Sequence, residues 1–179
     1  MLNRYTIQVL LAVFILFFNN TVSAEDNIKR AGDILQILLP AAAMGMTYIK
    51  GDEQGRKQFY KSFTATMAVT YALKLGVPDM RPDGSDNKSF VSGHTSAAFS
   101  GASFIQRRYG WKPGIPAYAA AAFVGWSRIE AKKHYIDDVA RGAAIGILST
   151  YIFTSPYKGV TITPVTGEDT YGISLQMNW

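Results

Sequence analysis

Most of the chain alternates long apolar segments with short turns rich in glycine, proline and charge, the pattern of a helical bundle. Gly76 and Pro78 end one such segment and Pro40 lies inside another, where it predicts a kink. Helices are predicted over residues 33–49, 57–75, 95–108, 117–129 and from Asp137 or Asp138 to 153, with connectors at 51–55, 78–90 and 110–116.

The end of the chain has a different pattern. Residues 160–165 and 171–179 alternate apolar and polar side chains, and the polar turn 166–169 separates them. This alternation predicts two paired strands that form a surface hairpin against the bundle. The predicted fold class is therefore all-α, a helical bundle with a short C-terminal β-hairpin-like tail.

The first two dozen residues look like a targeting segment. Arg4 precedes the apolar run Ile7–Phe18, and Val22-Ser23-Ala24 provides the small residues of a cleavage site. The predicted organisation is a signal peptide at 1–24, one domain at 25–157 and the tail at 158–179. An uncleaved N-terminal anchor is the alternative. Either way we expect an exported, periplasmic protein associated with the cytoplasmic membrane.

Composition narrows the chemistry. The chain has no cysteine, which excludes disulfides, thiolate nucleophiles and cysteine metal sites. Its net charge of +5 suits anionic substrates or an anionic membrane surface, whereas no Lys/Arg run indicates nucleic-acid binding. The mean hydropathy of +0.04 favours a bundle at, or partly in, the membrane over a deeply embedded one.

Three short motifs gather strong cations, one aspartate and both histidines of the chain: Lys74-x6-Arg81-Pro82, Ser92-Gly93-His94 and Ser127-Arg128-x5-His134-x3-Asp138. Lys and Arg side chains hold phosphate oxygens. Two histidines allow one to attack phosphorus while the other protonates the departing oxygen. The set predicts phosphoryl transfer.

Together these motifs resemble those of the phosphatidic acid phosphatase type 2 (PAP2) superfamily, which also includes bacterial acid phosphatases and vanadium haloperoxidases. Val91 stands where the family has proline. The resemblance implies that His134 is the nucleophile and forms a phosphohistidine, with Asp138 as its partner and His94 as the general acid. It also implies a phosphate site formed by Lys74, Arg81, Ser92, Gly93 and Arg128.

Local spacing agrees with part of this assignment. His134 and Asp138 are one helical turn apart, whereas Asp137 would point about 100° away. Ser92 has a second interpretation, as the N-cap of the following helix. The loop Asp83–Phe90 is short for the superfamily and predicts an open site.

We therefore expect a metal-independent phosphatase without a cofactor, acting on a lipid phosphate or diphosphate at the membrane surface. The candidate substrates are phosphatidic acid, phosphatidylglycerol phosphate, undecaprenyl diphosphate and lipid A. The alternatives are a general periplasmic acid phosphatase, a vanadium-dependent haloperoxidase, for which the chain is short, and a structural envelope protein. No protein partner is inferred.

Overall fold

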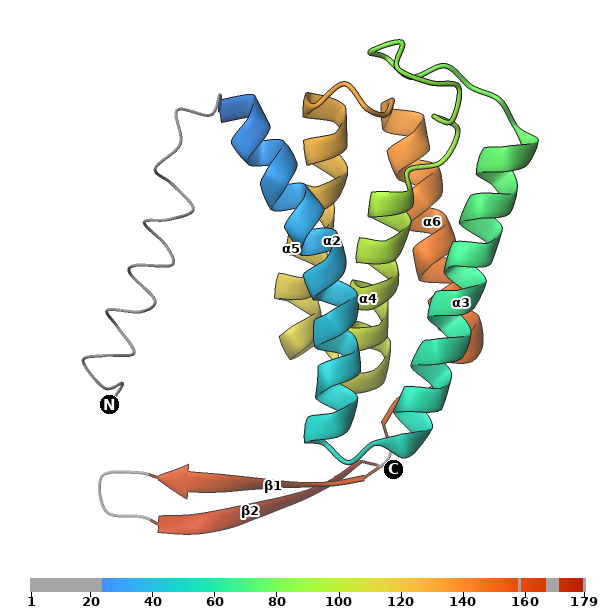
Figure 1. Cartoon of the computed structure of the whole chain (residues 1–179). Coiled ribbons are helices and arrows are strands. Elements are labelled where there is room, and N and C mark those ends of the chain that lie inside the picture. Colours follow the sequence, from blue (N-terminus) through green and yellow to red (C-terminus); the bar gives the residue numbers. More distant parts are fainter. Residues whose placement is uncertain (1–23, 158, 167–170, 179) are drawn as a thin grey trace.

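The computed structural model describes residues 24–157, 159–166 and 171–178 (Figure 1). The described part holds five helices: α2 (Ala24–Ile49), α3 (Glu53–Gly76), α4 (Gly93–Tyr109), α5 (Trp111–Glu130) and α6 (Ile136–Phe153). Strands β1 (Gly159–Thr166) and β2 (Tyr171–Asn178) follow. Of the predicted signal peptide, only Ala24 lies within the described residues.

Helix α4 is the centre of the bundle, and each of the other four helices packs against it (Figure 1). Most of its side chains are buried, and Phe104 meets Phe59 of α3 edge to face with ring centroids 5.0 Å apart. The prediction of an all-α bundle is confirmed.

Close approach of α6 to α4 depends on two glycines one turn apart. A Cβ on Gly142 would lie 2.6 Å from the Ser92 carbonyl oxygen, and one on Gly146 would lie 2.6 Å from the Ser96 carbonyl oxygen. Larger residues would push the two helices apart, because these contacts are with backbone. The beginnings of α4 and α6 are thereby held side by side, which positions the motif residues that they carry.

All five helices begin earlier than predicted, and the difference is largest for α2 and α5. Helix α2 starts at Ala24 instead of Asp33, and α5 starts at Trp111 although residues 110–116 were expected to be a connector. Pro113 lies in the first turn of α5, where its missing N–H costs no intrahelical bond, whereas Pro116 lies inside the helix and removes one such bond. Pro40 lies inside α2, as predicted.

The strands β1 and β2 pair antiparallel and lie beside the end of the bundle where α2 ends and α3 begins (Figure 1). Among the described residues the strands contact each other and no helix. The expectation that the hairpin packs against the bundle is therefore wrong.

A buried ion pair closes this same end of the bundle. Arg108 of α4 donates from Nη2 and Nε to the two oxygens of Asp52, at 2.6 and 2.7 Å. The Asp52 carboxylate also accepts from the Gly55 amide and the Tyr109 hydroxyl. Nη1 of Arg108 donates to the carbonyls of Ser155 and Pro156, which ties down the chain after α6. We call this cluster the closed end.

Candidate active site

The motif residues meet at the opposite end of the bundle, where α3 and α5 end and α2, α4 and α6 begin. A cavity of about 470 Å³ opens there. Six of the eight predicted site residues line it: Lys74, Arg81, Gly93, His94, Arg128 and His134. Ser92 and Asp138 are buried beneath it, with exposed fractions of 0% and 1%.

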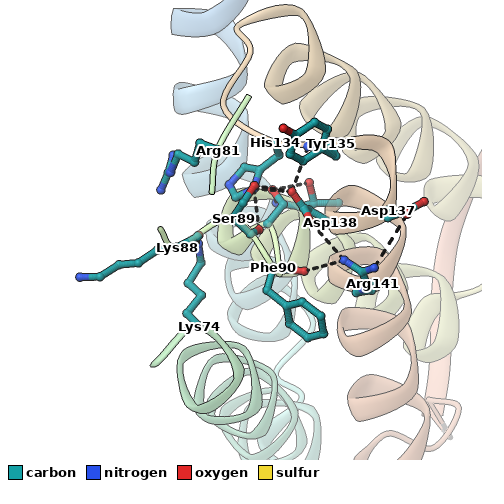
Figure 2. A network of polar contacts seen from close by, with 12 residues as sticks. Lys74, Arg81, Lys88, Ser89, Phe90, His134, Tyr135, Asp137, Asp138 and Arg141 are labelled. Carbon is teal, nitrogen blue, oxygen red and sulfur yellow. Dashed lines mark hydrogen bonds and ion pairs between the residues drawn. The ribbon is translucent and has the colours of Figure 1, made fainter. Parts of the chain in front are cut away.

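His134 lies in the loop between α5 and α6, with an exposed fraction of 3%. Its Nδ1 is 3.0 Å from the Ser89 carbonyl oxygen and 3.4 Å from Asp138 Oδ2 (Figure 2). Both neighbours are acceptors, so Nδ1 carries the proton and Nε2 keeps its lone pair. Burial first, then the charges of Lys74 and Arg81, lower the pKa of His134 to about 4. The ring is neutral at neutral pH and can act as a nucleophile.

Asp138 is held by several donors besides the histidine. Its Oδ2 accepts from the Ser89 hydroxyl at 2.5 Å and from the Tyr135 amide at 2.9 Å, and Oδ1 accepts from Arg141 at 3.1 Å (Figure 2). Asp137 points outward, with 74% of its side chain exposed. Ser89 went unnoticed in the sequence, although its carbonyl and hydroxyl bind both members of the pair.

The start of α4 forms the floor of the site. Ser92 is the N-cap: its hydroxyl oxygen accepts from the Thr95 amide at 3.4 Å and from the Thr95 hydroxyl at 2.9 Å. The N-cap interpretation of Ser92 therefore describes its side chain, which does not line the cavity. A Cβ on Gly93 would point into the space beside Lys74, 3.6 Å from Cε. Glycine thus leaves the helix N-terminus open to an anion.

Two cations from the first motif face His134 across the cavity (Figure 2). Lys74 donates to the Lys88 carbonyl at 2.9 Å, and Arg81 Nε donates to Asp86 at 2.7 Å. Burial first, and then the nearby charge of Arg81, lower the pKa of Lys74. Lys29, Lys88 and Lys133, which the sequence did not single out, also line the cavity. Three of the lining cations, Arg81, Arg128 and Lys133, are paired with carboxylates, and in all six cations and one carboxylate line the cavity.

That carboxylate belongs to Asp33 of α2, which the sequence analysis treated only as the start of a helix. Its Oδ1 accepts from Arg128 Nη1 at 2.7 Å and lies 2.9 Å from His94 Nε2. Arg128 Nη2 also donates to the Lys29 carbonyl, at 2.7 Å. No local signal pointed to Asp33, because it stands at the polar edge of the apolar segment, three residues after Arg30.

The described residues contain no group of three His, Cys, Asp or Glu side chains that could hold a metal ion. His94 and His134 each bond to a carboxylate, on different helices.

Val91, in place of the family's proline, is fully buried at the turn into α4.

Comparison with known proteins gives a consistent family. The sequence profile of the PAP2 superfamily matches residues 52–160. The chain is 29% identical over 170 residues to a lipid A 4'-phosphatase of Helicobacter pylori strain J99, covering 85% of each protein. It is 29% identical to a lipid A 1-phosphatase of Porphyromonas gingivalis over 142 residues, 73% of this chain but 31% of that protein.

Among solved structures, the crystal structure of Aquifex aeolicus LpxE superposes with a TM-score of 0.63 at 21% sequence identity. The match covers 79% of this chain and 92% of that one. At this identity the likeness concerns the fold, which is the helical bundle described above.

Proposed function

The chain belongs to the PAP2 superfamily, and from that premise we propose that it is a phosphatase that hydrolyses a phosphate monoester of a membrane lipid through a phosphohistidine on His134. One observation carries the proposal: a neutral histidine, with its proton fixed on Nδ1 by Ser89 and Asp138, lines a cavity with six cations. Attack on phosphorus requires a free Nε2 lone pair next to cationic side chains that can bind the phosphate oxygens.

In the first half-reaction Nε2 of His134 attacks phosphorus and the P–O bond to the lipid breaks. His94 gives the leaving oxygen a proton, and Lys74, Arg81 and Arg128 balance the charge on the equatorial oxygens. Asp138 stabilises the positive charge that develops on the His134 ring. In the second half-reaction water attacks phosphorus and gives a proton back to His94. The P–N bond breaks, and phosphate leaves.

A lipid substrate lies in a membrane, and the surface of the helices suggests how the protein contacts the bilayer. Each helix has a central stretch without charged residues, at 34–49, 62–73, 95–106, 113–127 and 142–153. At 1.5 Å per residue these stretches are roughly 20 Å long. On the outer faces they expose large apolar side chains such as Ile37, Ile115, Leu148 and Ile152, each 62–73% exposed. We propose that the bundle is embedded in the bilayer at this level.

Helix α2 meets the length and composition of a membrane-spanning helix by itself. Within Glu25–Ile49, an 18-residue window has a mean hydropathy of 1.3, and 22% of that window is buried inside the bundle. The near-zero mean hydropathy of the whole chain averages such stretches with the charged ends. It is therefore a poor guide to how deeply the bundle is embedded.

The N-terminal segment suggests an orientation for the bundle. Arg4 would keep the N-terminus inside, so the following apolar run delivers Glu25 to the outer side whether or not it is cleaved. With Glu25 on the outer side, the cavity that Lys29 and Asp33 line would lie on the periplasmic side.

Because the chain lacks cysteine, introduced cysteines test this orientation cleanly. Ser85→Cys, exposed beside the site, should react with a membrane-impermeant maleimide in intact spheroplasts. Lys112→Cys, exposed at the start of α5, should react only after permeabilisation. The reverse pattern, or equal labelling of both, contradicts the embedding and orientation proposed here.

Among lipid phosphates, the lipid A type is the substrate that we propose, because the relative matching 85% of both chains is a lipid A 4'-phosphatase. The test is phosphate release by the purified full chain in detergent from lipid A, phosphatidic acid and glycerol phosphate, with His134→Gln as background control. We expect kcat/KM for lipid A to exceed that for glycerol phosphate by at least about tenfold. Equal values would indicate a general acid phosphatase, and no release from any ester would refute the proposed function.

A further inference from the structure

His94 does not stand alone in the cavity. Its Nε2 lies 2.9 Å from Asp33 Oδ1, and the same oxygen lies 2.7 Å from Nη1 of Arg128. The His94 side chain is 33% exposed and that of Asp33 is 40% exposed, whereas that of Arg128 is only 3% exposed. Asp33 therefore lies at the open face of the site, between the acid and a phosphate-binding cation.

The placement of Asp33 is built into the packing of α2 on α5. A Cβ on Gly32 would overlap the Ser127 hydroxyl oxygen and lie 2.6 Å from Arg128 Nη2. Only glycine allows the two helices to approach so closely. The approach is secured by the bond from Arg128 Nη2 to the Lys29 carbonyl, one turn before Asp33.

We propose that Asp33 is a positioning residue for the reaction: its Oδ1 holds the Nε2–H of His94 and makes this histidine a charged acid that gives its proton from Nδ1. The inference rests on the proposed function. In the first half-reaction the Nδ1 proton passes to the leaving oxygen as the P–O bond breaks, and in the second Nδ1 takes a proton from the attacking water. Asp33 stays ionised throughout.

The electrostatics of the cavity explain why such a partner is needed. Burial first, then the charges of Arg128 and Lys74, lower the pKa of His94, and Asp33 opposes them. The charged and titratable groups lining the rest of the cavity are Lys29, Tyr71, Arg81, Lys88, Lys133 and His134. Asp33 is thus the one carboxylate in the cavity lining that favours the protonated ring.

The first measurement does not depend on activity. The chain has only two histidines, so NMR of histidine-labelled protein in detergent resolves both, and His134→Gln assigns them. We expect Asp33→Asn to lower the His94 pKa by about one unit or more, because it removes a negative charge at hydrogen-bond distance. Asp26→Asn, with the same charge change on an exposed residue of α2, should leave it unchanged.

The second measurement uses the leaving group. For a lipid phosphate, whose alkoxide leaving group needs a proton, Asp33→Asn should lower kcat/KM at neutral pH about tenfold and move its basic limb downward by a similar shift. For 4-nitrophenyl phosphate, whose phenolate leaves without a proton, the loss should stay below about twofold. A merely structural role would affect both substrates alike.

An unchanged His94 pKa in Asp33→Asn, or equal losses on the two substrates, would overturn the proposal. Circular dichroism checks that the variant is folded, and Asp33→Ser provides a second neutral replacement. Should the native protein hydrolyse neither ester, the proposed function fails, while the NMR titration still decides whether Asp33 sets the protonation of His94.

Discussion

Each end of the bundle contains a buried arginine paired with a carboxylate, but only one of the two pairs is closed. Arg108 and Asp52 are 3% and 4% exposed, and protein groups saturate the carboxylate on every side. Arg128 is equally buried, yet 40% of the Asp33 side chain is exposed and its Oδ1 is shared with a histidine.

The difference shows how one pair of residue types serves two purposes. A fully enclosed pair with all bonds satisfied joins α2, α3 and α4 and holds the chain after α6, so its removal should unfold the protein. A pair that is exposed to a cavity can still form hydrogen bonds with a ligand, so its loss should mainly change catalytic activity and not stability. The predictions below test this division between the ends.

The largest effect is expected at His134. Replacing it with Gln removes the nucleophile, and kcat/KM for a lipid phosphate should fall by at least about a thousandfold. The melting temperature should change little. A labelled phosphoenzyme trapped on the native protein should be acid-labile and base-stable, and absent from the variant. Residual activity above a few per cent would refute the assignment of the nucleophile.

The closed end should respond in the opposite way. Asp52→Asn leaves the Arg108 guanidinium buried without a counter-charge and should destabilise the fold by about 3–5 kcal/mol, measured as a large fall in melting temperature. Activity per folded molecule should persist at low temperature. Glu53→Gln, next in sequence with 76% of its side chain exposed, is the matched control and should change stability by less than about 0.5 kcal/mol. Equal effects of the two variants would contradict a structural role for the pair.

The two ends of the bundle should respond to acid at different pH values. The pKa of His134 falls from 6.5 to about 4 on folding, chiefly through burial, so the unfolded chain binds the proton first. Stability therefore declines as pH drops from 6.5 towards 4. After correction for ionisation of the substrate, kcat/KM should fall near pH 4, because His134 becomes protonated and can no longer act as a nucleophile. In His134→Gln the decline between pH 6.5 and 4 should be smaller.

The closed end should contribute to the pH dependence only in stronger acid. Burial raises the pKa of Asp52, but bonds from Arg108 and Gly55 outweigh it and lower the pKa below 3.8. Its stabilisation is present above pH 3.8 and is lost as pH falls below that value. Melting temperatures of the native protein and Asp52→Asn should therefore converge below pH 3.8. A constant difference in melting temperature through that range would show that protonation of Asp52 does not cause the loss of stability.

The smallest expected effect is that of a chelator. EDTA should leave phosphate release unchanged, since every role in the proposed reaction is filled by a side chain of the chain itself. Vanadate should inhibit, because it adopts the five-coordinate geometry of the transferring phosphoryl group. Loss of activity in EDTA that a divalent ion restores would show that the reaction needs a metal ion in addition to the Lys and Arg side chains of the site.

The sequence by itself determined the parts that depend on local spacing. Apolar segments and turn residues gave five helices, and the interval between His134 and Asp138 placed both on one turn. The residue types and intervals of the motif cations predict that they bind phosphate. The early start of α5 was missed, since prolines look like breakers until the first turn of a helix is located.

Only the tertiary structure decided what surrounds these residues. Ser89 is 45 residues from His134 and Asp33 is 61 residues from His94, and no local pattern relates such distant positions. Gly142 and Gly146 bring α6 against the backbone of α4, and Gly32 makes room for the Ser127 and Arg128 side chains, so these glycines decide which side chains meet. The protonation of each histidine depends on these neighbours. Lys74 and Arg81 disfavour the charged form of His134, whereas Asp33 opposes the lowering of the His94 pKa, and both effects act through space and not along the chain.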